Sequence, residues 1–284
     1  MDLLLAVLGS SVILGGLGLG FASLIALAHR RFKVFEDPRV DALAGMLPGS
    51  NCGACGSAGC RAFAENLVAG KKKPANCTVM DEDSIASVAQ YLGVDAGQVE
   101  KRVARLLCAG GCDVAPPQAE YIGLATCRAA AAVAGGGKTC AWGCLGFADC
   151  AEACDFDAIV MSPTRLPVVI PEMCTACGDC VTACPKDLFT LMPIEQKLIV
   201  QCKNPLEGDR AVAMCRVACN ACGKCALDAA PGLITMKHGL PVIDYGKNDL
   251  ADVSATARCP TGAIAWVEGA QFARRAPEPE GVLA

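Results

Sequence analysis

An α+β fold is predicted for this chain, with one membrane-spanning helix at the N-terminus followed by several small cysteine-rich modules. Three observations predict it. Residues Leu3 to Ala28 contain no charged side chain. The 284 residues include 21 cysteines, an odd number that disulfides within the chain cannot use up. These cysteines recur in short spacings that are typical of metal-ligand sets and not of disulfides that cross-link loops.

Composition excludes several classes of protein. The net charge of −4 argues against a nucleic-acid binder, which normally carries a basic footprint. Only two histidines occur, His29 and His238, and neither has a ligand-like setting. This counts against bis-His haem, Rieske centres and zinc fingers of mixed cysteine and histidine. Any metal is therefore expected to be held by thiolates.

The uncharged N-terminal run is long enough to cross a membrane. At about 1.5 Å per residue it exceeds the roughly 30 Å of a bilayer core. A cleaved signal peptide is the alternative, because Ala26-Leu27-Ala28 resembles a cleavage site. However, Asp2 precedes the run, and the basic stretch from His29 to Lys33 follows it. Basic flanks mark the cytoplasmic side, which predicts a single-pass anchor with the N-terminus outside and the cysteines inside.

The first ligand pattern follows a short juxtamembrane linker. It has the spacing C-x2-C-x4-C-x16-C, formed by Cys52, Cys55, Cys60 and Cys77. Small residues between the ligands let the backbone wrap closely around a [4Fe-4S] cubane and aim amide hydrogens at its sulfides. A structural zinc site of four cysteines is the alternative.

The N-terminal region resembles a known family. The stretches from Phe35 to Val40 and from Leu47 to Ala64, placed after a membrane helix, are similar to the B subunits of Rnf complexes. That resemblance extends to about residue 267. It implies an iron-sulfur electron relay in a bacterial cytoplasmic (inner) membrane complex that oxidises soluble ferredoxin, reduces NAD and pumps ions. The implied partners are the A, C, D, E and G subunits, ferredoxin and the lipid bilayer.

A ferredoxin motif dominates the middle of the chain. The spacing C-x2-C-x2-C-x3-C-P begins at Cys174 and ends at Pro185, as in two-cluster ferredoxins whose fourth cysteine ligates the other cluster. The earlier half-motif is irregular, because Phe147 stands where a ligand is expected and Cys140 is the nearest replacement. The predicted sets are Cys140, Cys144, Cys150 and Cys184 for one cluster, and Cys154, Cys174, Cys177 and Cys180 for the other. An alternative is that Cys127 or Cys215 replaces Cys140.

A second module is a reduced version of the first. Its expected ligand positions are partly lost, at Ala229, Asp249, Asp252 and Ala255. These four losses belong to one cluster, so one complete set survives, formed by Cys219, Cys222, Cys225 and Cys259. This departs from the paired motifs of the family and predicts one cluster in the module.

Five cysteines remain outside these sets. They are Cys108, Cys112, Cys127, Cys202 and Cys215. The favoured fifth set is Cys108, Cys127, Cys202 and Cys215, with Cys112 left out; buried free thiols are the alternative. The sequence thus predicts four [4Fe-4S] clusters, or five if this set forms.

The expected domain boundaries follow from these motifs. They are a transmembrane anchor 1–29, a small helical [4Fe-4S] domain 30–80, a helical linker region 81–135, a two-cluster ferredoxin-like module 136–200, a reduced ferredoxin-like module 201–268 and a disordered tail 269–284.

Local patterns predict a few individual elements. A helix is expected from Arg61 to Val68 in the first domain. Apolar positions between Asp81 and Leu107 at mixed helical spacing predict two short helices. The apolar segments 158–160 and 188–191, which follow the two half-motifs of the ferredoxin-like module, are expected to be strands that cover the clusters.

An electron-relay subunit is the function favoured by these patterns. No acid/base pair, nucleophile or nucleotide site is recognisable, so the chain alone is expected to catalyse no bond chemistry. Two alternatives stay open: a membrane-tethered zinc protein that binds partners, and an iron-sulfur relay to a redox-sensing transcription factor.

Overall fold

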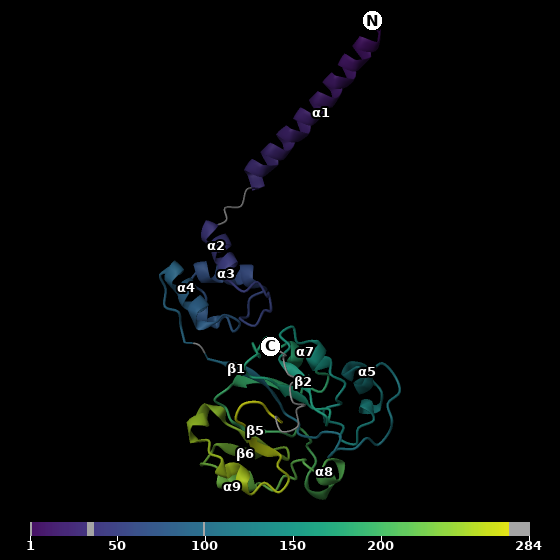
Figure 1. The fold of residues 1–284 in the computed structure, drawn as a ribbon, viewed down its shortest axis with the longest axis vertical. Coiled ribbons are helices and arrows are strands. Elements are labelled where there is room, and N and C mark those ends of the chain that lie inside the picture. The colour runs from purple at the N-terminus through teal and green to yellow at the C-terminus, as the bar shows by residue number, and fades with distance from the viewer. Residues whose placement is uncertain (1, 33–36, 99, 273–284) are drawn as a thin grey trace, which may run out of the picture.

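The N-terminus forms one long helix that extends away from the rest of the chain (Figure 1). The structure is a computed structural model and describes residues 2–32, 37–98 and 100–272. Helix α1 runs from Asp2 to Phe32. Its stretch Ser11–Phe32 has a mean hydropathy of 2.1 and is the one helix in the described part that is long and apolar enough to cross a membrane. The structure thus has a candidate spanning helix where the sequence predicts the anchor.

A small helical domain follows the anchor helix. It consists of α2 (Pro38–Met46), α3 (Cys60–Val68), the 3-10 turn η1 (Pro74–Asn76) and α4 (Glu82–Leu92). Local signals set its boundaries: Asp37 caps α2 in front of Pro38, and Asp81 caps α4 by accepting a hydrogen bond of 2.8 Å from Ser84 N. The helices pack around an apolar core that includes Leu43, Phe63, Leu67 and Val88.

The remaining strands and helices form two modules with the same order of elements. Module I contains β1 (Arg102–Leu106), α6 (Asp149–Glu152), β2 (Ile159–Met161), β3 (Pro167–Val169), α7 (Asp179–Ala183) and β4 (Phe189–Pro193). Module II contains β5 (Leu198–Val200), α9 (Lys224–Asp228), β6 (Ile234–Lys237), β7 (Leu240–Ile243), the 3-10 segment η3 (Tyr245–Leu250), α10 (Ser254–Ala257) and β8 (Ile264–Trp266). In Figure 1 module I is mostly teal and module II green to yellow.

The two modules share their strand pairing. In each, the first and last strands form an antiparallel pair, β1 with β4 and β5 with β8, and the middle strands form a hairpin, β2 with β3 and β6 with β7. Leu106 pairs with Phe189 and Val200 pairs with Ile264, so position 106 of module I corresponds to position 200 of module II. The next residue continues this match, since Leu107 N donates to Leu188 O and Gln201 N donates to Ala263 O, both at 2.7 Å.

Each module contains a long connection between its first strand and its first helix. Residues 107–148 join β1 to α6 and contain α5 (Cys127–Ala132) and η2 (Ala134–Gly136). Residues 201–223 join β5 to α9 and contain α8 (Gly208–Met214). Both connections carry cysteines that lie outside the regular motif spacing.

Two expectations from the sequence are wrong. The second helix predicted between 81 and 107 is strand β1, so module I begins inside the region expected to be a helical linker. Four buried positions in a row, 103 to 106, explain the error, because a short apolar run does not separate helix from strand. The expectation that the disordered tail begins at residue 269 is wrong for residues 269–272: Gln271 is 3% exposed, and Arg105 Nη1 donates to Gly269 O at 2.6 Å. The rest of the predicted tail, 273–284, lies outside the described residues.

Candidate functional site

The first cysteine motif is assembled by the helical domain. Cys60 opens α3, and its backbone N–H donates to Asn51 Oδ1 at 2.8 Å. Cys77 follows η1, is buried, and has Cys55 and Cys52 as electrostatic neighbours. Burial raises the pKa of the Cys77 thiol, while backbone N–H groups of Val79 and Met80 donate to its sulfur. Three members of this N-terminal set (Cys52, Cys55, Cys60 and Cys77) therefore share one apolar core, namely Cys55, Cys60 and Cys77. The fourth, Cys52, is an electrostatic neighbour of Cys77.

Four cavities in the described part of the two modules are each lined by four cysteines. We name the groups set A (Cys127, Cys144, Cys150 and Cys184), set B (Cys154, Cys174, Cys177 and Cys180), set C (Cys219, Cys222, Cys225 and Cys259) and the interface set (Cys108, Cys140, Cys202 and Cys215). The space between the atoms lining each cavity, including the part that is open to solvent, is about 310 to 320 Å³. Sets B and C have the same members as the groups predicted from the sequence.

Set A and the interface set differ from the expected groups by an exchange of two cysteines. The sequence favours Cys140 beside Cys144 and places Cys127 in the fifth group, whereas the structure places Cys127 beside Cys144 and Cys140 beside Cys108. The replacement of Cys140 by Cys127 is one of the alternatives that the spacing leaves open. The backbone N–H of Phe147 donates to the Cys127 sulfur, so Cys127 lies next to the position where a regular motif would carry a cysteine.

Helix α5 is held in place for this role by α6. Asp149 Oδ1 accepts a hydrogen bond from Cys127 N at 2.6 Å, and Asp149 Oδ2 accepts one from Arg128 N at 3.0 Å. The Thr126 hydroxyl accepts a third bond from Ala129 N at 3.2 Å. These acceptors satisfy the free N–H groups of the first turn. Because Asp149 precedes Cys150 in the chain, the same element positions two members of set A.

Set B occupies the regular half of module I. Burial raises the pKa of Cys180 to about 12 and that of Cys177 to about 11. The Thr175 hydroxyl lines the cavity, is buried, and has no hydrogen-bond partner among the described residues. A buried hydroxyl without a partner is costly. This orphaned group fits a cavity that holds a hydrogen-bond acceptor such as a sulfide.

Set C lies in module II, between α9 and the loop before β8. Burial alone would raise the pKa of Cys259, but the backbone N–H groups of Ile264, Thr261 and Ala263 donate to its sulfur, and their combined effect lowers the pKa. Backbone N–H donors aimed at a sulfur stabilise a thiolate. Cys222 is exposed, so this cavity reaches the protein surface.

Two of the four lost ligand positions of module II, Ala229 and Ala255, lie in packed protein, whereas Asp249 and Asp252 are exposed. Ala255 belongs to a core cluster with Leu198 and Leu233, and Ala229 and Tyr245 pack against that cluster. The Tyr245 hydroxyl donates to Leu198 O at 3.0 Å, and burial raises the pKa of Tyr245 to about 12. Apolar side chains thus stand where two members of set B, Cys154 and Cys180, stand in module I.

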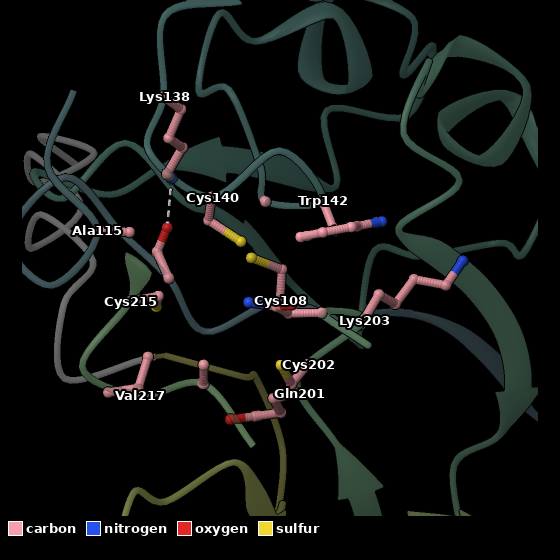
Figure 2. A pocket seen from close by; sticks show the side chains of 14 residues that line it. Cys108, Ala115, Lys138, Cys140, Trp142, Gln201, Cys202, Lys203, Cys215 and Val217 are labelled. Atoms are coloured by element: carbon pink, nitrogen blue, oxygen red, sulfur yellow. Dashed lines mark hydrogen bonds between the residues drawn. The ribbon is translucent and has the colours of Figure 1, made fainter. Parts of the chain in front are cut away.

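The interface set draws its thiols from both modules. Figure 2 shows the side chains of Cys108, Cys140, Cys202 and Cys215 around one space, with Lys138, Trp142 and Lys203 at its border. Cys108 and Cys140 belong to the β1–α6 connection, and Cys202 and Cys215 to the β5–α9 connection. The remaining thiol, Cys112, is exposed and lines a separate, wider groove.

The thiols of these cavities are poorly solvated. Burial raises the pKa of Cys144 to about 12 and that of Cys202 and Cys215 to about 11. Neighbouring thiols add repulsion; Cys108, for example, opposes the ionisation of Cys144. A bare thiol in such a place stays protonated at neutral pH and ionises when a cationic metal centre compensates. The donor sets therefore fit an iron centre held by thiolates.

Comparison with protein families identifies two iron-sulfur regions. Residues 47–79 match a family model described as "Putative Fe-S cluster", which contains the whole N-terminal set. Residues 167–190 match "4Fe-4S binding domain", which contains Cys174, Cys177, Cys180 and Cys184. These matches support iron-sulfur clusters as the cofactors of this chain.

Comparison with curated proteins finds relatives over most of the chain. The B subunit of a Na(+)-translocating ferredoxin:NAD(+) oxidoreductase complex from Acetobacterium woodii is 44% identical over 83% of this chain and 71% of its own length. The B subunit of a proton-translocating ferredoxin:NAD(+) oxidoreductase complex from Clostridium ljungdahlii is 36% identical, covering 89% and 90%. The B subunit of an ion-translocating oxidoreductase complex from Methanosarcina acetivorans is 33% identical, covering 90% and 97%.

Proposed function

Because the chain belongs to the family of B subunits of ion-translocating ferredoxin:NAD oxidoreductase (Rnf) complexes, we propose that it relays electrons from reduced ferredoxin to other subunits of such a complex. The observation that carries the proposal is the row of four-cysteine cavities of nearly equal size in modules I and II. Equal cavities with the same donor set are suited to one repeated cofactor. When bound, a [4Fe-4S] cluster supplies one-electron redox chemistry.

The protein's own contribution is to hold and tune these centres. We propose that the N-terminal set and sets A, B and C are the ligands of four clusters. Backbone N–H groups directed at the sulfurs of Cys77 and Cys259, together with burial of the thiols, are the features that set cluster potential. Module I would carry two clusters and module II one within its own fold, so both modules act as ferredoxin-like carriers.

The anchor and the partners belong to the same proposal. Helix α1 would hold the relay at the membrane, with its basic end, Arg30 and Arg31, on the cytoplasmic side. Ferredoxin would deliver electrons there, and the other subunits of the complex would carry out NAD reduction and ion transport. These partners follow from the names of the relatives.

Zinc binding is the competing use of four-cysteine sites, and the arrangement of the thiols argues against it. A zinc ion binds thiolates at about 2.3 Å, so its four sulfurs lie within about 4 Å of one another. Within the residues that the structure describes, no group of three or more His, Cys, Asp or Glu side chains converges closely enough to hold a single ion.

The first experiment separates a relay from a zinc protein. The full-length chain, purified anaerobically in detergent and reconstituted with iron and sulfide, should be brown, should bleach with dithionite and should recover its colour with an electron acceptor. Reduced ferredoxin should bleach it as well, because ferredoxin is the proposed donor. A colourless protein that binds zinc stoichiometrically would contradict the proposal.

A second experiment tests the membership of set A. Cys127→Ala should remove one cluster, because Cys127 lies where the regular motif has Phe147. The double variant Cys127→Ala/Phe147→Cys restores the C-x2-C-x2-C-x3-C spacing and should recover the lost iron. Cys112→Ala serves as the matched control, since this exposed thiol lies outside the five sets. Unchanged iron content in Cys127→Ala would show that Cys127 is not a ligand.

A further inference from the structure

The four thiols of the interface set occupy equivalent positions in the two modules. Cys108 lies two residues after the end of β1, and Cys202 lies two residues after the end of β5. Cys140 precedes Cys144 by four residues, and Cys215 precedes Cys219 by four. Each module thus contributes one thiol from the end of its first strand and one from just before its ligand motif. Two modules with the same fold have their corresponding residues facing a shared cavity.

Hydrogen bonds repeat the same equivalence. Cys144 N donates to Cys108 Sγ at 3.4 Å in module I, and Cys219 N donates to Cys202 Sγ at 3.3 Å in module II. The two modules are joined beside the cavity by a backbone hydrogen bond of 3.0 Å from Ala109 N to Gln201 O. The cavity is therefore a regular part of the contact between modules, since an accidental gap would not have matching donors on both sides.

The space between the thiols is kept open. Gly110 lines it, and a Cβ atom at this position would lie 3.0 Å from Cys215 Sγ and 3.6 Å from Cys108 Sγ. Any larger residue at position 110 would therefore intrude among the sulfurs. Lys138 Nζ fixes the Gly110 backbone by donating to its carbonyl at 2.5 Å (Figure 2). Lys138 Nζ also donates to Cys144 O at 2.6 Å.

The lining also contains a donor without a partner. Asn204 is 1% exposed, and its Nδ2 atom has no hydrogen-bond partner among the described residues, although Oδ1 accepts a bond of 2.9 Å from Leu206 N. A buried amide N–H without a hydrogen-bond partner is destabilising. Because Asn204 lines this cavity, a sulfide-containing group inside it would supply the missing acceptor.

We propose that the interface set ligates a fifth [4Fe-4S] cluster, shared between the two modules, and that this cluster is the electron bridge between sets A and C. This inference rests on the proposed relay function and adds the route that electrons take. Cys108 connects to set A through the hydrogen bond from Cys144, and Cys202 connects to set C through the bond from Cys219. One electron would pass along this line without any bond being formed or broken.

The route gives the clusters of the two modules an order. Cys150 of set A and Cys180 of set B belong to the same core cluster of buried residues, so these two sets adjoin within module I. The spatial order of the proposed clusters is then set B, set A, the interface set and set C. In module II the place of a further centre is filled by apolar side chains around Ala255, so the line ends at set C, where Cys222 is exposed.

Iron counting in paired variants tests the shared site. The reconstituted full-length protein should contain about 20 iron atoms per chain if all five sets are filled. Cys140→Ala and Cys215→Ala, which change different modules, should each lose about four, and the double variant should lose no more than either single variant. By contrast, Cys140→Ala/Cys144→Ala should lose about eight, because the two residues belong to different clusters. The control is Cys112→Ala, with no loss.

A spectroscopic measurement tests the bridging role. In the reduced wild-type protein, the paramagnetic clusters of set A and set C should each couple magnetically to the interface cluster and show broadened EPR signals. In Cys140→Ala the set C signal should sharpen while its intensity is kept. Gly110→Val leaves all ligands in place but fills the cavity, and it should give the same loss of iron and the same sharpening, which separates loss of the cavity from misfolding caused by a missing thiol.

The outcomes distinguish the two proposals. If the wild type is brown and bleaches with reduced ferredoxin, but Cys140→Ala and Cys215→Ala keep all their iron, the shared cluster is refuted and the relay stands. The shared cluster is equally refuted if the double variant loses twice the iron of the single variants. If the wild type itself binds no iron and sulfide, the relay function fails, and the bridge fails with it.

Discussion

At the scale of single residues, Arg105 is the most unusual side chain of module I. It is 1% exposed, and two of its guanidinium nitrogens have no hydrogen-bond partner among the described residues. Burial lowers its pKa, and the Cys174 thiol opposes that effect. The strand register matches Arg105 with Ile199 of module II, the module without a counterpart of set B. Of these two equivalent strand positions, only the one in the module with the additional ligand set carries a buried positive charge.

We expect Arg105→Met to lower the reduction potential of the cluster held by set B. A nearby buried cation favours the more negative, reduced form, and its removal should shift the midpoint by tens of millivolts, on the order of 1–2 kcal/mol of charge interaction. Potentiometric EPR titration measures the shift. Arg102→Met is the matched control, because this arginine is exposed on the same strand. An equal shift in both variants would show that the effect is not specific to the buried charge.

At the scale of elements, the segment after β8 completes the edge of strand β1. Gln271 Oε1 accepts a hydrogen bond of 2.8 Å from Leu106 N, and Gln271 Nε2 donates one of 3.0 Å to Leu106 O. The side-chain amide thereby takes the place of a further strand. Both bonds are buried, so this segment after module II is attached to the first strand of module I.

Gln271→Ala should destabilise the protein by about 1–3 kcal/mol, because it leaves the buried N–H and C=O groups of Leu106 without partners. Faster hydrogen exchange of the Leu106 amide and a denaturation midpoint at a lower denaturant concentration in the reconstituted protein would show this loss of stability. Gln118→Ala, at an exposed position, should leave both unchanged. If the amide of Leu106 exchanges at the wild-type rate in Gln271→Ala, the attachment contributes nothing to β1.

The elements also show what the sequence can predict and what it cannot. Helix α3, β2 and β4 lie where the sequence predicts a helix and two strands, since local patterns determine them. Sets B and C follow from regular spacing. Spacing cannot decide the exchange of Cys127 and Cys140, because it depends on how the long connection 107–148 folds back onto Phe147 and on where the two modules meet. Gln271 reads as part of a tail in the sequence, because a single side chain bonding to a strand edge leaves no periodic signal.

At the scale of the whole molecule, the anchor helix and the cysteine-bearing domains are structurally separate. All side chains described in α1, from Ser11 to Phe32, are exposed, and none belongs to a hydrophobic core cluster of the described residues. An exposed apolar helix of this length is stable in a bilayer and costly in water. The described side chains of α1 therefore contribute no packing to the thiolate sites.

Deleting residues 1–32 should accordingly release the protein from the membrane without changing its iron content. The truncated chain should appear in the soluble fraction and carry the same number of iron atoms per chain as the detergent-solubilised full-length protein. Protease digestion of the full-length protein tests sidedness in parallel: the cysteine-bearing domains should be cleaved in inverted vesicles and protected in intact spheroplasts, because basic residues that follow a span are expected on the cytoplasmic side. Cleavage in intact spheroplasts would reverse the orientation, and loss of iron on truncation would show that α1 supports a site that its exposed side chains do not suggest.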